Sequence, residues 1–245
     1  MDLGIKNKVA LVTAASQGLG KASAIELANE GVKLAICSRD QEKINQTADE
    51  IKNLSGAEVL AVKADLDNTD DIENLIKEIE KKFNKVDILI NNTGGPKAGF
   101  FDDLSDEDWL KTFESTFLSA VRVTRKVLPF MKKNKWGRII NISSVSAKQP
   151  IDNLMLSNGV RMSIHGWAKT LSNQVASDNI LSNNVCPGFT HTERVDGLIK
   201  AQLKNSNSSR EDIIESIASD IPAKRVGQAE ELAALVTFLS SEKAS

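Results

Sequence analysis

The sequence predicts an α/β fold, a doubly wound parallel sheet with helices on both faces, in a single domain spanning residues 1–245. Short runs rich in β-branched residues alternate with longer amphipathic stretches along the chain. A chain of 245 residues with 41% hydrophobic residues can bury one large core. No linker, repeat or low-complexity tract divides it. This alternation indicates right-handed strand–helix–strand units around a parallel sheet.

Four strand and helix pairs make up the first half of the chain. Each strand is a short apolar run, and each following helix repeats apolar residues at helical spacing. The pairs are 8–13 with 19–30, 32–38 with 41–54, 58–62 with 69–83, and 86–91 with 107–132.

The second half adds two strands, at 138–143 and 180–186, with a helix at 154–177 between them and a last helix at 229–240. The polar, turn-prone stretch 201–210 is the candidate for a mobile loop, with an ordinary surface loop as the alternative. Around it, we expect residues 193–220 to form a substrate lid.

Composition excludes several classes of partner. The formal net charge is −2, so no overall basic field would hold nucleic acid or an anionic membrane. No segment reaches the roughly 18 apolar residues of a membrane span, and residues 1–9 leave no room for a signal peptide. Cys37 and Cys186 indicate buried thiols and not a disulfide or a metal site. We therefore expect a cytoplasmic protein without metal, nucleic acid or membrane partners.

A turn between the first strand and the first helix, TAASQGLG at residues 13–20, has the composition of a phosphate-binding turn. Its glycines let the backbone approach a pyrophosphate, and the helix N-terminus offers free N–H groups and a positive dipole. Ala14 stands where a glycine is usual, which would tighten the turn. The predicted cofactor contacts here are Thr13, Ala15, Ser16, Gln17, Gly18, Leu19 and Gly20.

Further motifs follow in a fixed order: KADLDN around Asp65, NNTGG at 91–95, GRIINISSVS at 137–146, and CPGFTHT at 186–192. With these motifs the chain, from residue 8 to 245, resembles the short-chain dehydrogenases/reductases, and among them most the β-ketoacyl-acyl-carrier-protein reductases. The resemblance implies a Rossmann fold, whose final edge strand we expect to be missing from this chain. It also implies cofactor contacts at Asp65 and Leu66, Asn91 and Gly94, and Pro187, Gly188, Thr190 and Thr192.

The end of the second strand bears on cofactor choice, because Ser38 and Arg39 stand there. An acidic residue would bind a free ribose 2′-hydroxyl, whereas a guanidinium binds a 2′-phosphate. A solvated Arg39, partly neutralised by Asp40, is the alternative. We favour NADP(H), with NAD(H) possible.

The resembled family reacts through a Ser, a Tyr and a Lys, with an Asn on a neighbouring helix. The resemblance places these four at Ser144, Ser157, Arg161 and Thr116, and this chain contains no tyrosine. A serine hydroxyl is a far poorer acid than a phenol. Arg161 can also bind ribose hydroxyls but stays protonated. We therefore expect cofactor binding to survive better than proton transfer.

Two histidines offer another source of protons. His191 lies next to Thr192 and could protonate an alkoxide. A loop histidine that faces the solvent is the interpretation we prefer. His165 shares a helix face with Ser157 and Arg161, and we expect it to serve in helix packing or a subunit contact.

The substrate and partner regions are predicted from loops and helix faces. Loops 95–97 and 146–153, with Glu193 and Arg194, are pocket candidates, because open α/β sheets bind ligands at the carboxyl ends of their strands. Lys97 and Arg194 could meet a carboxylate or phosphate, or be ordinary surface charges. Helices 107–132 and 154–177 carry apolar residues beyond one stripe, which indicates either core packing or the dimer or tetramer interface that the resemblance implies.

Two functions compete. One is an oxidoreductase resembling 3-oxoacyl-acyl-carrier-protein reductases, which transfers hydride between NADP(H) and a carbonyl or alcohol substrate with a non-standard proton donor. The other is a nucleotide-binding protein without turnover, acting as a sensor or partner subunit. The retained cofactor motifs favour the first, although general acid catalysis normally supplies about 10²–10⁴ in rate.

Overall fold

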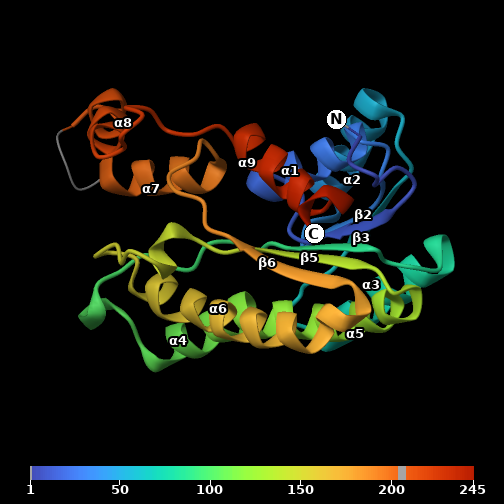
Figure 1. Ribbon diagram of the computed structural model, residues 1–245. Coiled ribbons are helices and arrows are strands. Elements are labelled where there is room, and N and C mark those ends of the chain that lie inside the picture. Colours follow the sequence, from blue (N-terminus) through green and yellow to red (C-terminus); the bar gives the residue numbers. More distant parts are fainter. Residues whose placement is uncertain (1, 204–207) are drawn as a thin grey trace.

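The protein, described by a computed structural model over residues 2–203 and 208–245, is built on six parallel strands in one sheet (Figure 1). The strand order is β3-β2-β1-β4-β5-β6, which confirms the doubly wound α/β fold. The strands are β1 (Val9–Val12), β2 (Lys33–Ser38), β3 (Val59–Lys63), β4 (Ile88–Asn91), β5 (Gly137–Ile142) and β6 (Ile180–Val185).

Helices cover both faces of the sheet. On one face α1 (Gly18–Asn29), α2 (Gln41–Ser55) and α9 (Ala229–Leu239) pack over β1 and β2, and on the other lie α3 (Thr69–Phe83), α5 (Ser119–Asn134) and α6 (Met155–Val175) (Figure 1). Successive side chains of a strand point to opposite faces, so Ala10 and Val12 enter one apolar core and Leu11 the other. A sheet buried on both faces needs the continuous apolar strands that the sequence shows.

The long helix predicted at 107–132 is interrupted, which corrects that expectation. It consists of α4 (Asp106–Thr112), a π-helical turn over Phe113–Leu118, and α5. Within it, hydroxyls bond back to the backbone, from Ser115 to the carbonyl of Thr112 and from Ser119 to that of Ser115. Such back-bonding competes with the regular hydrogen-bond ladder of the helix.

The segment predicted as a lid contains two helices, α7 (Glu193–Leu203) and α8 (Arg210–Ser219), at one end of the sheet (Figure 1). Val195, Ile199 and Ile213 form a small apolar cluster between them, separate from the two main cores. Part of the polar stretch 201–210, residues 204–207, lies outside the described residues. A lid role for 193–220 remains a prediction.

β6 forms one edge of the sheet, and in the described chain after it no strand pairs with its outer side. The segment after α9 is instead tied to β5 through Arg138, whose side chain is fully buried. Arg138 Nε donates to the carbonyl of Ser241 at 3.0 Å, and Nη1 donates to those of Gly137 and Asn179 at 2.9 and 3.2 Å. Its guanidinium also lies 4.5 Å from the centre of the Trp136 ring.

Replacing Arg138 with methionine is expected to lower the free energy of unfolding by about 2–4 kcal/mol, because the carbonyls of Ser241, Gly137 and Asn179 each lose a hydrogen bond from a buried guanidinium. Urea denaturation followed by tryptophan fluorescence measures this. Arg125→Met is the matched control, since Arg125 is exposed on α5, and its stability should change by less than about 0.5 kcal/mol. Equal effects of the two substitutions would contradict the anchoring role of Arg138.

Candidate functional site

A cavity of about 860 Å³ opens at the carboxyl ends of the strands, where doubly wound sheets bind their ligands. Loops after all six strands line it, together with the start of α7. Of the predicted cofactor contacts, it is lined by Ser16, Gln17, Gly18, Leu19, Ser38, Arg39, Asp65, Leu66, Gly94, Arg161, Pro187, Gly188, Thr190 and Thr192.

The turn predicted to bind phosphate contains two residues with a left-handed backbone. Ala14 adopts a left-handed backbone with φ of 47°, and Gly18 does so with φ of 57°. Gln17 precedes the first residue of α1, so the free N–H groups of that helix start at the cavity wall. The turn therefore presents backbone donors and a helix dipole to an anion in the cavity.

Three predicted contacts of this turn lie behind the cavity wall, and their contact with a cofactor remains a prediction. Thr13 is buried and clamps the ends of β1 and β4: its hydroxyl donates to the carbonyl of Asn92 at 2.7 Å and accepts from Asn92 N–H at 2.8 Å. Ala15 is buried in the core. Gly20 packs so closely that a Cβ would lie 2.6 Å from the carbonyl oxygen of Ala14 and from Asn92 Nδ2. These residues shape the turn but do not line the cavity.

The end of the cavity at β2 and β3 carries charges of both signs, since Asp40, Asp65 and Asp67 line it as well. Arg39 and Lys43 both line it. Asp40, which could neutralise Arg39, caps α2 by accepting the Lys43 N–H at 3.1 Å, and its carboxylate lies 4.0 Å from Lys43 Nζ. In the described residues no carboxylate lies within ion-pair distance of Arg39. Its guanidinium is therefore available to a ligand.

Asn91 lies in the sheet and does not line the cavity, and its contact with a cofactor remains a prediction. Its Nδ2 donates to Thr124 Oγ1 at 3.0 Å and to Asn141 Oδ1 at 2.9 Å, and Asn141 in turn donates to Asn184 at 2.9 Å. This amide ladder joins β4, β5 and β6. The next residue, Asn92, lines the cavity instead, as its position on the opposite side of the chain allows.

Three of the four positions implied by the resemblance meet at one cavity wall. Ser144 follows β5, while Ser157 and Arg161 lie one turn apart on α6. Ser157 Oγ and Ser146 Oγ are 3.0 Å apart, and the Ser146 N–H donates to Ser144 Oγ at 3.1 Å. The hydroxyls of Ser144 and Ser157 are thus linked through Ser146.

Arg161 is buried beneath these serines. Its Nη1 donates to the carbonyls of Ile142 and Ser143 at 3.1 and 3.0 Å. Burial, with a smaller effect from Arg194, lowers the pKa of Arg161 to about 10. The guanidinium therefore stays charged at neutral pH and can stabilise negative charge but not pass a proton on.

The fourth position, Thr116, lies off the cavity. It is buried in the π-helical turn, and Thr112 and Ser115 from the same region line the cavity instead. Neither residue was predicted from the sequence, because the resemblance gives a position along the chain and not the direction that a π-helical turn gives each side chain.

The two histidines also lie away from the cavity. His191 is exposed, and its backbone N–H donates to the carbonyl of Gly227 at 2.8 Å, which agrees with a histidine that faces the solvent. His165 Nε2 lies 3.0 Å from Ser143 Oγ and 3.7 Å from Cys186 Sγ, so it joins α6 to the ends of β5 and β6. Burial lowers the pKa of His165, which favours its neutral form.

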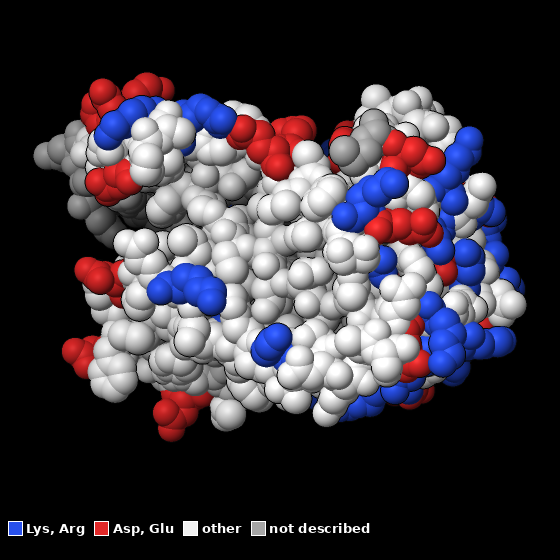
Figure 2. All heavy atoms as spheres, in the orientation of Figure 1, with Lys and Arg blue, Asp and Glu red and all other residues white. Residues whose placement is uncertain are grey.

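The surface outside the cavity is relevant to the predicted oligomer contact. In Figure 2 the centre of the visible face carries few charged side chains, and charges gather toward the side of α1, α2 and β3. Leu110, Phe113 and Met162, on or next to α4 and α6, expose large apolar side chains. An oligomer contact through these helices remains a prediction.

The described residues contain neither a metal-binding cluster nor a membrane-spanning helix. Within them, no three His, Cys, Asp or Glu side chains come together in a way that could hold a metal ion. None of the helices there has the length and apolar character to cross a membrane.

Known proteins share this fold and sequence pattern. Residues 8–203 match the short chain dehydrogenase family. The NADPH-dependent reductase BacG of Bacillus subtilis is 34% identical over 242 residues, covering 98% of this chain and 93% of that protein. The 3-oxoacyl-[acyl-carrier-protein] reductase FabG of Staphylococcus epidermidis is 30% identical, covering 97% of this chain and 93% of that protein.

A solved structure agrees closely in three dimensions. L-sorbose reductase from Gluconobacter frateurii, complexed with NADPH and L-sorbose, aligns with a TM-score of 0.95 at 31% identity, over 100% of this chain and 93% of that one. These reductases are named for different substrates, and their identities to this chain fall within a narrow range. The similarity therefore supports the family as a whole more than one subgroup, and the chain belongs to the short chain dehydrogenase family.

Proposed function

We propose that this protein is an NADP(H)-dependent oxidoreductase that transfers a hydride between the cofactor and a carbonyl or alcohol substrate. The observation that carries the proposal is the shared cavity, which joins the phosphate-binding turn, Arg39 and the group of Ser144, Ser157 and Arg161. The relatives support it, since BacG is named as NADPH-dependent and the sorbose reductase structure contains NADPH.

The lining residues fit a nicotinamide dinucleotide. The turn at 14–19 offers backbone donors for a pyrophosphate. Gly94 and Gly188 line the cavity with open space where a Cβ would stand, so flat rings could approach the backbone there. Arg39 and Lys43 would hold a 2′-phosphate at the other end.

Arg39→Gln is expected to weaken NADPH binding about 10–100-fold and to leave NADH binding unchanged, because a charge-assisted bond to the 2′-phosphate is lost. Titration of cofactor fluorescence measures both dissociation constants. Lys63→Gln is the control, since Lys63 is exposed at the end of β3 and does not line the cavity. An equal weakening of NADPH binding and NADH binding would show that Arg39 does not bind the 2′-phosphate.

Each side chain at the reacting end has a role that its contacts support. The Ser144 hydroxyl would donate to the substrate carbonyl, with its orientation held by the Ser146 N–H. Arg161 would bind ribose hydroxyls and stabilise the developing alkoxide through its charge. When bound, the nicotinamide supplies the hydride. Water or a substrate group would supply the proton, because Arg161 stays protonated.

The reaction is expected to be slow for this family. The chain has no tyrosine, and at the position the resemblance assigns to it Ser157 is bound to Ser146. Loss of a general acid removes about 10²–10⁴ in rate, or roughly 3–5 kcal/mol of transition-state stabilisation. Positioning of the hydride is a separate contribution that the retained cofactor cavity would preserve.

A protein that binds the nucleotide without turnover is the second candidate, favoured by the changes at three of the four catalytic positions. Single-turnover mixing of the protein with NADPH and a panel of ketones and 3-oxoacyl thioesters separates the two. Cofactor oxidation with one product stereoisomer supports the oxidoreductase. Tight NADPH binding without oxidation across the panel supports the sensor or partner subunit.

A further inference from the structure

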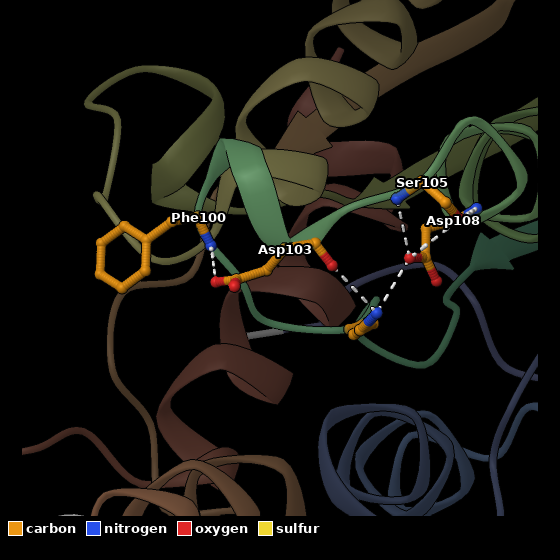
Figure 3. Close-up of polar contacts among 5 residues, drawn as sticks. Phe100, Asp103, Ser105 and Asp108 are labelled. Atoms are coloured by element: carbon orange, nitrogen blue, oxygen red, sulfur yellow. Dashed lines mark hydrogen bonds and ion pairs between the residues drawn. The ribbon is translucent and has the colours of Figure 1, made fainter.

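Besides Arg161, two cationic side chains from the loop after β4 and the start of α7 line the cavity, and their contacts distinguish them. Lys97, in the loop after β4, is already paired: its Nζ lies 2.9 Å from Asp108 Oδ2 and 3.3 Å from the carbonyl of Asp103. Figure 3 shows Asp108 also accepting the Ser105 N–H in this loop. The bond from Lys97 lowers the pKa of Asp108, which keeps the pair ionised. Lys97 therefore has its counter-charge within the protein.

Arg194, in the first turn of α7, is held by backbone alone. Its Nη2 donates to the carbonyl of Pro96 at 2.6 Å. The guanidinium lies against Gly95, where a Cβ would come within 2.8 Å of Arg194 Cζ. Among the residues that the structure describes, no carboxylate lies within ion-pair distance of Arg194. One bond fixes the guanidinium over the loop and leaves its other donors for a ligand.

A second unpaired guanidinium faces the same cavity. Arg161 is buried, donates only through Nη1, and like Arg194 has no carboxylate partner in the described part of the chain. The charge of Arg194 lowers the pKa of Arg161, so the two guanidinium groups act on one another. Two positive charges in one partly desolvated cavity are stabilised when an anion binds between or beside them.

The carboxylate nearest to Arg194 in the sequence, that of Glu193, lies at the phosphate-binding turn and not at the loop of residues 95–97. Glu193 Oε2 lies over the phosphate-binding turn, 3.4 Å from where a Cβ on Gly18 would stand. The positive charge at the loop of residues 95–97 is therefore left for a ligand.

We propose that Arg194 binds an anionic group of the substrate, a carboxylate or a phosphate, and so makes the protein selective for anionic carbonyl compounds. The inference rests on the proposed function, because it concerns the substrate of the same cavity. The Pro96 carbonyl would hold the guanidinium so that two parallel N–H groups meet two oxygens of the anion. The reacting carbonyl would then lie toward Ser144, which lines the same cavity.

Matched substrate pairs test the proposal. The pairs are a 3-oxo acid with its methyl ester, and a keto-sugar phosphate with the free keto-sugar, each with saturating NADPH. The anionic member of at least one pair should have the higher kcat/KM, and which pair responds distinguishes carboxylate from phosphate. Arg194→Gln should lower kcat/KM for that anion about 10–100-fold, mainly through KM, and leave the neutral member unchanged.

Two further variants control for structure. Arg194→Lys should retain part of the preference, since it keeps the charge but not the planar fork. Lys200→Gln should keep the preference, because Lys200 is exposed on the same helix α7 and does not line the cavity. NADPH affinity should be the same in all variants. An equal loss for the anion and its neutral partner, or no anion preference in the unmodified protein, would overturn the role of Arg194.

A binding measurement keeps this test separate from turnover. Calorimetric titration of the 3-oxo acid and of the sugar phosphate into the protein, with NADP⁺ and without it, should show binding that Arg194→Gln removes. If no substrate is reduced but this binding occurs, the proposed oxidoreductase is wrong and the anion site stands. If substrates are reduced without charge preference and no anion binds, the proposed function stands and the anion site is wrong.

Discussion

Replacing Ser157 with tyrosine and Arg161 with lysine together is expected to raise kcat/KM for a carbonyl substrate by about 10²–10⁴. Ser157 lines the cavity one helical turn before position 161, so a phenol there would extend toward the Ser144 hydroxyl. The ammonium of the lysine would lower the pKa of that phenol from about 10 toward neutrality. Steady-state NADPH oxidation measures the change.

A phenylalanine version of the same variant controls for volume. Ser157→Phe with Arg161→Lys fills the same space without an acid, so it should show no gain over the unmodified protein. Circular dichroism and NADPH titration establish that both double variants fold and bind the cofactor. If the tyrosine variant binds NADPH as the phenylalanine variant does and is no faster than it, proton transfer does not limit the rate, and the protein has an adequate donor of its own.

Gly20→Val is expected to lower the free energy of unfolding by about 3 kcal/mol and to weaken NADPH binding at least tenfold. A side chain at position 20 would meet the Ala14 carbonyl and Asn92 Nδ2, each 2.6 Å from the Cβ. The first is backbone and cannot turn aside, so α1 must move away from β1. That movement displaces the helix N-terminus from the phosphate-binding turn. Urea denaturation and cofactor fluorescence measure the two effects.

Gly166 provides the matched control within the same protein. It lies in α6 with open space where a Cβ would stand, so Gly166→Ala should leave NADPH binding unchanged and stabilise the protein by up to about 1 kcal/mol. Unchanged cofactor affinity in a folded Gly20→Val protein would show that the close approach of α1 does not shape the site.

Most of the fold could be predicted from the sequence because its signals are local. The helix predicted at 69–83 is α3, Thr69–Phe83, where Asn68 caps the start and Asn84 takes the left-handed conformation at the end. The π-helical turn at Phe113–Leu118 could not be predicted in the same way. The bonds from the Ser115 and Ser119 hydroxyls to the backbone depend on side-chain direction, which an apolar pattern does not record.

The candidate site was predicted less completely, because a motif gives the chain position of a residue but not its side-chain direction. Asn91 and Asn92 are adjacent in NNTGG, yet one side chain enters the amide ladder and the other the cavity wall. Thr13 and Gly20 both belong to the phosphate-binding motif, yet Thr13 bonds to Asn92 and Gly20 packs against Ala14 behind the cavity wall. A distinction of this kind depends on neighbours far along the chain.

The central position of β1 has a consequence for synthesis of the protein. The residues of β1 are fully buried and pair with β2 on one side. The other side of β1 stays unpaired until β4 has been synthesised, when Ala10 can lie opposite Ile88. At roughly 5–20 residues per second, the ribosome leaves that apolar edge open for several seconds after β2 has emerged. An open edge of this kind readily pairs with another chain. Nascent chains should therefore need protection by chaperones until residues 88–90 are available.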